Sequence, residues 1–221
     1  MKVKVSRVTL HRHASALDGL VDYIAVPAGS GGLKLGVARD ILSSIKKSAP
    51  VLSVYKSSFT WVVDAARKSD IPLIEYVMPV PSISAGILAE MLSQYGVRLG
   101  TVLEWDHGWR PEDPCAYARS LNSIASNIEY ILIRGVEQGN PPLAEVERAS
   151  RCSSLLGVSI SPEGELACRI LGSGVGLLDF DIGGSSEDAL ARIRDTISVS
   201  RECSRSPGGA GNGVRGKKPG V

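Results

Sequence analysis

Short apolar runs alternate with longer segments of helical spacing along almost the whole chain. The runs are rich in β-branched residues and recur at 3–8, 22–26, 51–55, 73–77, 97–103, 130–133, 155–159 and 176–180. After each run, apolar residues return every three or four positions, as Val37, Ile41 and Ile45 do in a helix predicted over 35–48. Strands that alternate with helices indicate a parallel sheet with its helices packed outside. Eight such units in about 200 residues predict a closed α/β fold, the (β/α)8 TIM barrel.

Length and composition agree with one barrel followed by a tail. The chain has 221 residues, and no linker rich in proline, glycine and serine divides the first 200. A hydrophobic fraction of 43% with only 5% aromatics suits a core of valine, isoleucine, leucine and alanine. We therefore predict a single domain over 1–203. Residues 204–221 lack apolar periodicity and should form a disordered tail rich in glycine, serine and basic residues.

Charge and cysteine content narrow the expected partners and location. A net charge of +2 is too small to indicate nucleic acid as a partner, and no apolar run approaches the roughly 18 residues of a membrane helix. We expect no signal peptide, because the chain opens directly with a strand, and the cysteines show neither a C-x-x-C pair nor metal-ligand spacing. We expect a soluble cytoplasmic protein with reduced thiols, no metal, and no contact with membranes.

Polar residues directly after two strands carry the first candidate chemistry, because barrel active sites lie where strands end and loops begin. Asp106 follows the fifth strand, Arg134 ends the sixth, and Glu137 comes three residues later. A buried arginine without an anion is costly, which favours an anionic ligand at Arg134. The alternative is a structural ion pair with one of three acidic residues, Asp179, Asp181 or Glu104.

The seventh and eighth strands each lead into a helix start. Ser159 stands just before one of them, and Gly183 and Gly184 stand before the other. Free backbone N–H groups at a helix N-terminus form an anion site, which predicts phosphate binding at these three residues. Empty turns can have the same pattern.

Three segments carry a resemblance to phosphoribosylanthranilate isomerases. Residues 2–9 read K-V-K-V-S-R-V-T and are similar to the first-strand motif of that family, K-V-K-I-C-G-L-T. Residues 156–163, L-G-V-S-I-S-P-E, resemble the seventh-strand motif L-A-G-G-L-T-P-E-N. Residues 176–184, G-L-L-D-F-D-I-G-G, resemble the eighth-strand motif G-V-D-V-S-S-G-V-E. The order and spacing of the three segments extend the resemblance over about residues 1–200.

The resemblance implies an isomerase of tryptophan biosynthesis. Its reaction is the Amadori rearrangement of N-(5-phosphoribosyl)anthranilate to the carboxyphenylamino-deoxyribulose phosphate, with no metal or organic cofactor. The family uses a cysteine after strand one as base and an aspartate after strand six as acid, and binds the substrate phosphate after strands seven and eight. The resemblance is compatible with a monomer or a homodimer.

The matched catalytic positions hold other residues in this chain. Ser6 stands at the cysteine position and Arg134 at the aspartate position. We therefore predict that Ser6, Asp106 and Glu137 supply the proton-transfer groups, with Arg134 on the substrate carboxylate or phosphate. Two alternatives remain. One is a catalytically lapsed barrel that binds a small anionic metabolite or a protein partner, and the other is a prenyl-transferring, phosphate-binding barrel.

Overall fold

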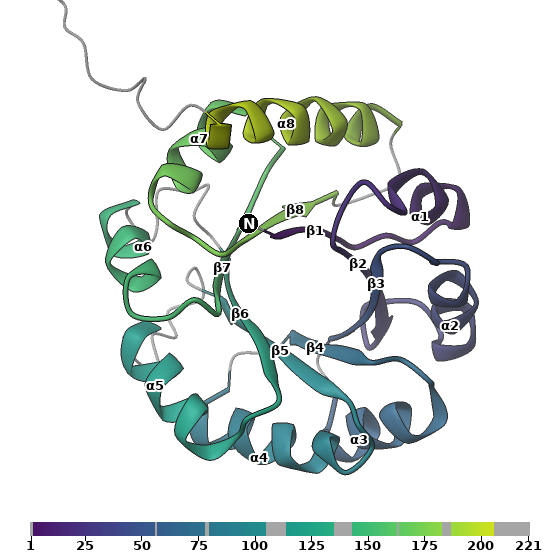
Figure 1. Cartoon of the computed structure of the whole chain (residues 1–221). Coiled ribbons are helices and arrows are strands. Elements are labelled where there is room, and N and C mark those ends of the chain that lie inside the picture. The colour runs from purple at the N-terminus through teal and green to yellow at the C-terminus, as the bar shows by residue number, and fades with distance from the viewer. Residues whose placement is uncertain are drawn as a thin grey trace, which may run out of the picture.

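Eight parallel strands close into a barrel in chain order, so that the last strand lies beside the first. The computed structural model describes residues 2–55, 57–77, 80–104, 114–134, 143–162, 164–182 and 187–205. Figure 1 looks into the barrel, with the helices in an outer ring around the strands. The predicted (β/α)8 barrel is confirmed.

The elements alternate without exception along the described chain. The strands are β1 (Lys2–Ser6), β2 (Tyr23–Gly29), β3 (Ala49–Tyr55), β4 (Leu73–Val77), β5 (Arg98–Glu104), β6 (Ile128–Arg134), β7 (Leu156–Ile160) and β8 (Leu177–Asp181). The helices are α1 (His11–Leu17), α2 (Leu35–Ser43), α3 (Phe59–Lys68), α4 (Ser82–Ser93), α5 (Pro114–Ile124), α6 (Leu143–Ser150), α7 (Gly164–Gly172) and α8 (Glu187–Arg205). Each predicted strand overlaps an observed one.

The period-two pattern of the strands decides which side chains face the helices. In β1, Val3 and Val5 belong to the large apolar cluster between strands and helices. Lys4 and Ser6 are also fully buried, but they alternate with the valines and face the inside of the barrel. The interior of the barrel is therefore polar at this level, whereas the layer between strands and helices is apolar.

The second helix is shorter than predicted, because the carboxylate of Asp18, the residue after α1, binds the backbone beyond its end. Helix α2 ends at Ser43 rather than at residue 48. The side chain of Asp18 accepts hydrogen bonds from the backbone N–H groups of Lys46, Lys47 and Ser48, at 2.9, 2.8 and 2.7 Å. Those amides thus bind Asp18 instead of continuing the helix.

All four cysteines form disulfides, so the expectation of reduced thiols is wrong. Cys115 in α5 bonds Cys152, just after α6, and Cys168 in α7 bonds Cys203 in α8, each pair with Cα atoms 5.7 Å apart. Packing of neighbouring outer helices brings together residues 37 and 35 positions apart, which their spacing did not reveal. Cross-links over loops of this length stabilise a fold by about 3–4 kcal/mol each. The expected cytoplasmic location was linked to reduced thiols, so the cysteines no longer support it.

Helix α8 includes the first two residues of the predicted tail, because it ends at Arg205. Residues 206–221 lie outside the described part, and the disordered tail stays a prediction. Across the ranges that the structure describes, no helix combines the length and apolar character needed to cross a membrane.

Candidate active site

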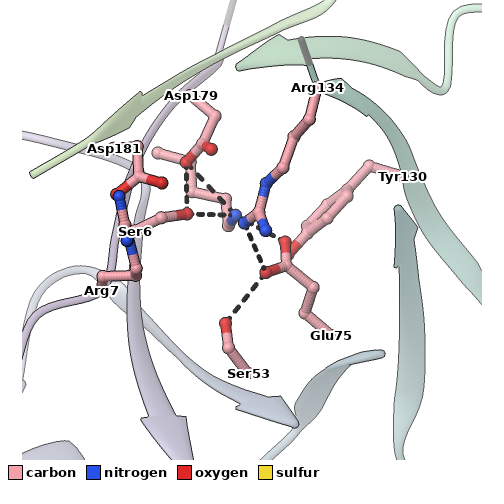
Figure 2. A network of polar contacts seen from close by, with 9 residues as sticks. Ser6, Arg7, Ser53, Glu75, Tyr130, Arg134, Asp179 and Asp181 are labelled. Carbon is pink, nitrogen blue, oxygen red and sulfur yellow. Dashed lines mark hydrogen bonds and ion pairs between the residues drawn. The ribbon is translucent and has the colours of Figure 1, made fainter. Parts of the chain in front are cut away.

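A network of charged and hydroxyl side chains fills the middle of the barrel. We call it the interior cluster, and its members are Lys4, Ser6, Ser53, Glu75, Tyr130, Arg134 and Asp179. Figure 2 shows Ser6 and Asp179 on one side, Glu75 with Tyr130 on the other, and Arg134 reaching in from above. These residues come from strands β1, β3, β4, β6 and β8, so only the closed barrel assembles them.

Lys4 links the two sides of the interior cluster. Its Nζ lies 2.5 Å from Glu75 Oε2 and 3.2 Å from Asp179 Oδ1, and it donates to Ser6 Oγ at 2.7 Å. The ammonium also lies 5.4 Å from the ring centroid of Tyr130. An ammonium has three N–H donors, and each has an acceptor here. This full set of partners is what permits a lysine side chain with no exposed surface.

Glu75 is the acceptor at the centre of the network. Ser53 Oγ donates to Oε1 and Tyr130 OH donates to Oε2, both at 2.9 Å. Burial alone would raise the pKa of Glu75, but the positive charges of Lys4 and Arg134 outweigh it and hold that pKa below its usual value. Glu75 is therefore a carboxylate that balances two cations.

Tyr130 reaches Glu75 because the strand between them carries a glycine. Gly100 of β5 pairs with Glu75 on one side and with Tyr130 on the other. A Cβ atom at Gly100 would lie 2.5 Å from Tyr130 Cε2, closer than a side chain allows. Glycine at this position thus makes room for the phenol ring. Burial and the neighbouring Glu75 raise the pKa of Tyr130 well above its usual value, so its hydroxyl stays a donor.

Arg134 is the last residue of β6, and some of its N–H donors have no acceptor among the described residues. Its Nη2 lies 3.6 Å from Glu75 Oε1, and its side chain is 14% exposed. Neither Nε nor Nη2 has a hydrogen-bond partner among the described residues, although both are buried. Burial opposes the charge of Arg134, but Glu75, Tyr55, Asp179 and Asp181 raise its pKa, so the guanidinium stays charged. It can bind an anion.

Ser6 is tied to Asp179 rather than free. Its hydroxyl donates to Asp179 Oδ1 at 2.6 Å while accepting from Lys4. The second oxygen of that carboxylate, Oδ2, is buried without a hydrogen-bond partner in the described part of the chain, and so is Tyr55 OH at the end of β3. Burial raises the pKa of Tyr55 to about 12, which leaves it protonated. Within the described residues, a carboxylate oxygen, two guanidinium nitrogens and a phenol hydroxyl without hydrogen-bond partners therefore share this end of the barrel.

An ion pair lies beside Ser6 at the barrel mouth. Asp181, the last residue of β8, pairs in register with Ser6, and its Oδ1 accepts from Nε of Arg7. Both side chains reach solvent, with 45% of Arg7 and 22% of Asp181 exposed. Figure 2 shows this pair next to Ser6 and Asp179.

The structure brings three of the predicted site residues to one end of the barrel. Ser6 ends β1, Arg134 ends β6, and Ser159 precedes the last residue of β7, buried but for 6% of its surface. The ion-pair partner of Arg134 is Glu75, which is none of the three carboxylates considered from the sequence. The remaining predicted residues, Asp106, Glu137, Gly183 and Gly184, lie outside the described residues.

Sequence reasoning missed Lys4, Glu75 and the contact of Asp179 with Ser6. A signal was present, because each charge interrupts an apolar strand at a position that alternates with buried outward residues. In β4, for example, Glu75 stands between Ile74 and Tyr76. A charge at such a position in a two-sided buried strand predicts an internal polar cluster, but not its partners.

Known proteins share both the sequence and the fold of this chain. It is 35% identical over 204 residues to the N-(5′-phosphoribosyl)anthranilate isomerase of Aeropyrum pernix. The aligned residues cover 89% of this chain and 93% of that protein. The phosphoribosyl anthranilate isomerase structure from Thermococcus kodakaraensis matches 92% of this chain and 98% of its own at 16% identity, with a TM-score of 0.69. The N-(5′-phosphoribosyl)anthranilate isomerase structure from Pyrococcus furiosus matches 91% and 99% at 13% identity, with a TM-score of 0.70. The two structures support the barrel fold. No protein-family model matches the chain.

Proposed function

Since this chain belongs to the N-(5′-phosphoribosyl)anthranilate isomerase family, as its sequence predicted, we propose that it catalyses the isomerisation after which the family is named. The sequence relationship over nearly the whole chain carries the proposal. The polar end of the barrel supports it, because guanidinium N–H groups and a carboxylate oxygen that have no hydrogen-bond partner among the described residues suit a substrate that carries anions and must move protons.

The proposed reaction moves protons but needs no oxidant or reductant. Protonation of the ribose ring oxygen breaks its bond to C1 and leaves an iminium between C1 and nitrogen. Removal of the proton on C2 sends that electron pair into a C1–C2 double bond and neutralises the nitrogen. Return of a proton to C1 and loss of the C2 hydroxyl proton then give the ketone. One acid and one base, each worth about 10²–10⁴-fold in rate, are required.

We assign the base to the pair of Ser6 and Asp179. Ser6 stands at the position of the family's catalytic cysteine, but its hydroxyl already donates to Asp179 at 2.6 Å. The carboxylate is the stronger base of the two, and its Oδ2 is the acceptor without a partner. In this assignment Ser6 and Lys4 orient the carboxylate, and Asp179 takes the proton from C2.

The other predicted residues keep their proposed roles. Asp106 or Glu137 supplies the acid, and Ser159, Gly183 and Gly184 bind the phosphate. Arg134 holds the substrate carboxylate, because its Nε and Nη2 can donate to both oxygens of one carboxylate. A turnover assay of Asp106→Asn and Glu137→Gln tests the acid: wild-type rates in both would remove this assignment.

The decisive test joins complementation to enzymology. We expect the gene to restore growth without tryptophan to an auxotroph that lacks the isomerase, and the purified protein to turn over N-(5-phosphoribosyl)anthranilate in a fluorescence assay. Asp179→Asn should lower kcat by about 10²–10⁴-fold. Thr101→Val is the matched control: it removes a buried hydroxyl that lies 3.2 Å from Tyr117 OH, outside the barrel interior, and should leave kcat within about 3-fold.

A second candidate function is a lapsed barrel that binds a small anionic metabolite. The substitutions at the two matched proton-transfer positions, Ser6 and Arg134, favour it. The same experiment separates the two: a folded protein that binds the reduced product analogue without turnover supports the lapsed barrel. Failure of both growth and binding contradicts the isomerase.

The finer statements about partners and location are also proposals. We propose a monomer or homodimer, which light scattering on the purified protein would resolve, and a cytoplasmic site of action. Fractionation with thiol labelling tests the location, because the paired cysteines leave it without support from thiol chemistry.

A further inference from the structure

Arg7 adopts a backbone conformation that arginine rarely takes. Its φ is 57°, and among the described residues it is the one non-glycine residue with a positive φ. In the first-strand motif given above, a glycine stands at this position. The Cβ atom of a side chain is sterically disfavoured in this left-handed region, whereas glycine has no Cβ and adopts it readily. Residues held in such conformations concentrate at functional sites, so the long cationic side chain at this position calls for a reason.

The ion pair with Asp181 does not use up the guanidinium of Arg7. Only Nε donates to Asp181 Oδ1, and the two terminal nitrogens have no partner among the described residues. Five N–H groups belong to a guanidinium, so four remain for an anion. With 45% of the side chain exposed, these donors are accessible to a ligand from solution.

The position of Arg7 in the barrel selects the kind of anion. It directly follows β1, and closure of the barrel puts β1 beside β8. The phosphate of the substrate is expected at the ends of the seventh and eighth strands, next to this corner of the mouth. Asp181, however, adds a negative charge there, which would repel a phosphate unless a cation offsets it.

We propose that Arg7 binds the 5-phosphate of the substrate, with Asp181 holding the guanidinium in position. Arg7 supplies two terminal N–H donors to the phosphate and offsets the charge of Asp181. Together with Arg134 on the carboxylate, this gives each end of the substrate its own arginine. The identity of the ligand as a sugar phosphate rests on the proposed isomerase function, whereas the anion site itself does not.

Binding of inorganic phosphate tests the anion site without reference to activity. Titration of the full chain, followed by ³¹P NMR line broadening, should give a dissociation constant that rises about 10-fold or more in Arg7→Gly. Glycine relieves the strained conformation, so this variant should unfold at the same or a higher temperature than the wild type. If Arg7 only stabilised the fold through Asp181, Arg7→Gly would instead lower the melting temperature and leave phosphate affinity unchanged.

A matched control lies at the opposite end of the barrel. Arg98 is 47% exposed and also pairs with a carboxylate, that of Glu129. Arg98→Ala removes the same charge from the same kind of setting and should leave phosphate affinity within about 2-fold. Equal losses in Arg98→Ala and Arg7→Gly would mean that net charge alone attracts phosphate, and would overturn the proposal.

The sign of the Asp181 effect is a further check. Asp181→Asn removes the negative charge that repels the phosphate, while its amide oxygen can still accept from Nε of Arg7 and keep the guanidinium in position, so phosphate should bind about 3-fold more tightly. Weaker binding in Asp181→Asn would show that this carboxylate does not repel the anion, and would contradict the placement of the phosphate beside it.

Activity separates this proposal from the proposed function. If the isomerase proposal holds, Arg7→Gly should raise KM for N-(5-phosphoribosyl)anthranilate with a smaller change in kcat. A wild type without turnover whose phosphate affinity still depends on Arg7 would end the isomerase proposal and retain the anion site. If the wild type turns over the substrate but its phosphate affinity is the same in Arg7→Gly, the isomerase proposal stands and the anion site at Arg7 is ruled out.

Discussion

Two glutamates of this barrel have the same kinds of partner but very different surroundings. In the interior cluster, Glu75 accepts from Tyr130 and pairs with Lys4 of β1 and with Arg134. At the amino-terminal end of the strands, Glu129 accepts from Tyr23 and pairs with Lys2 of β1 and with Arg98. We call this second group the basal cluster (Lys2, Tyr23, Arg98, Glu129).

Access to water distinguishes the two clusters. Lys4 and Glu75 have no exposed side-chain surface, whereas Lys2 is 56% exposed, Arg98 47% and Glu129 10%. Water can replace a lost partner in the basal cluster but not in the interior one. The same chemical groups therefore form an obligatory charge balance in the interior and a replaceable one at the base.

An aromatic pair connects the clusters. The rings of Tyr23 and Tyr130 meet edge to face, with centroids 5.9 Å apart. Each hydroxyl points to the glutamate of its own cluster. Across this one layer of side chains the barrel thus changes from partly exposed to fully buried charges, and the proposed active site lies on the buried side.

The largest expected difference comes from neutralising each glutamate. Glu75→Gln leaves Lys4 and Arg134 with excess positive charge in a buried interior and should lower the free energy of unfolding by about 3–5 kcal/mol. Glu129→Gln should lower it by about 1 kcal/mol or less, because its cations are half-exposed. Urea unfolding measures both, and repeating it in about 1 M NaCl should shrink only the Glu129 effect. Equal losses would show that burial does not separate the clusters.

Removing one hydroxyl from each cluster sharpens the comparison with a gentler change. Tyr130→Phe leaves one acceptor site of the buried Glu75 without its donor and should lower the free energy of unfolding by about 1.5–3 kcal/mol. Tyr23→Phe should lower it by about 1 kcal/mol or less, since water and Lys2 can still reach Glu129. Thermal melts of the two variants provide the measurement, and a larger loss in Tyr23→Phe would contradict the ranking.

Lowering the pH should weaken the stabilisation that both glutamates provide. We expect this effect on the free energy of unfolding to be smaller than the effects of the substitutions above. The pKa of each glutamate lies below its usual value of 4.5: burial opposes this, but Lys4 and Arg134 lower that of Glu75, and Tyr23 and Lys2 lower that of Glu129. The unfolded chain therefore binds more protons as pH falls, so this stabilisation is present above about pH 4.5 and is lost below it.

Unfolding free energies measured between about pH 5 and pH 3 should then fall less steeply in Glu75→Gln than in the wild type. The variant can lose no stabilisation from a carboxylate that it lacks. An unchanged slope would mean that the titration of Glu75 does not contribute to acid unfolding.

The sequence predicted the elements well because local patterns encode them. The alternation in β1 and the cap of α3 are readable from neighbouring residues: Ser58 accepts from the backbone N–H of Trp61, as a serine before the first turn of a helix commonly does. Helix ends were less predictable. The end of α2 depends on Asp18, a residue far from it along the chain, which binds the backbone amides that follow the helix.

The candidate site was only partly predictable for the same reason. Ser6 and Arg134 followed from the resemblance and from their place at strand ends, and the structure brings both to one end of the barrel. Their partners, Asp179 and Glu75, were not identified, because a hydrogen bond between β1 and β8 or an ion pair between β4 and β6 leaves no trace in local spacing. The disulfides were missed on the same ground.

By itself, the sequence determined the order of strands and helices, the barrel class and the family, since these depend on periodicity and on motifs read along the chain. Tertiary structure alone decided which charges neutralise one another, because the closed barrel brings together strands that are distant in sequence and removes the water that would otherwise screen them. Among the described residues, Arg134 and Asp179 keep buried polar atoms without a hydrogen-bond partner at the end of the barrel where we propose that the substrate binds.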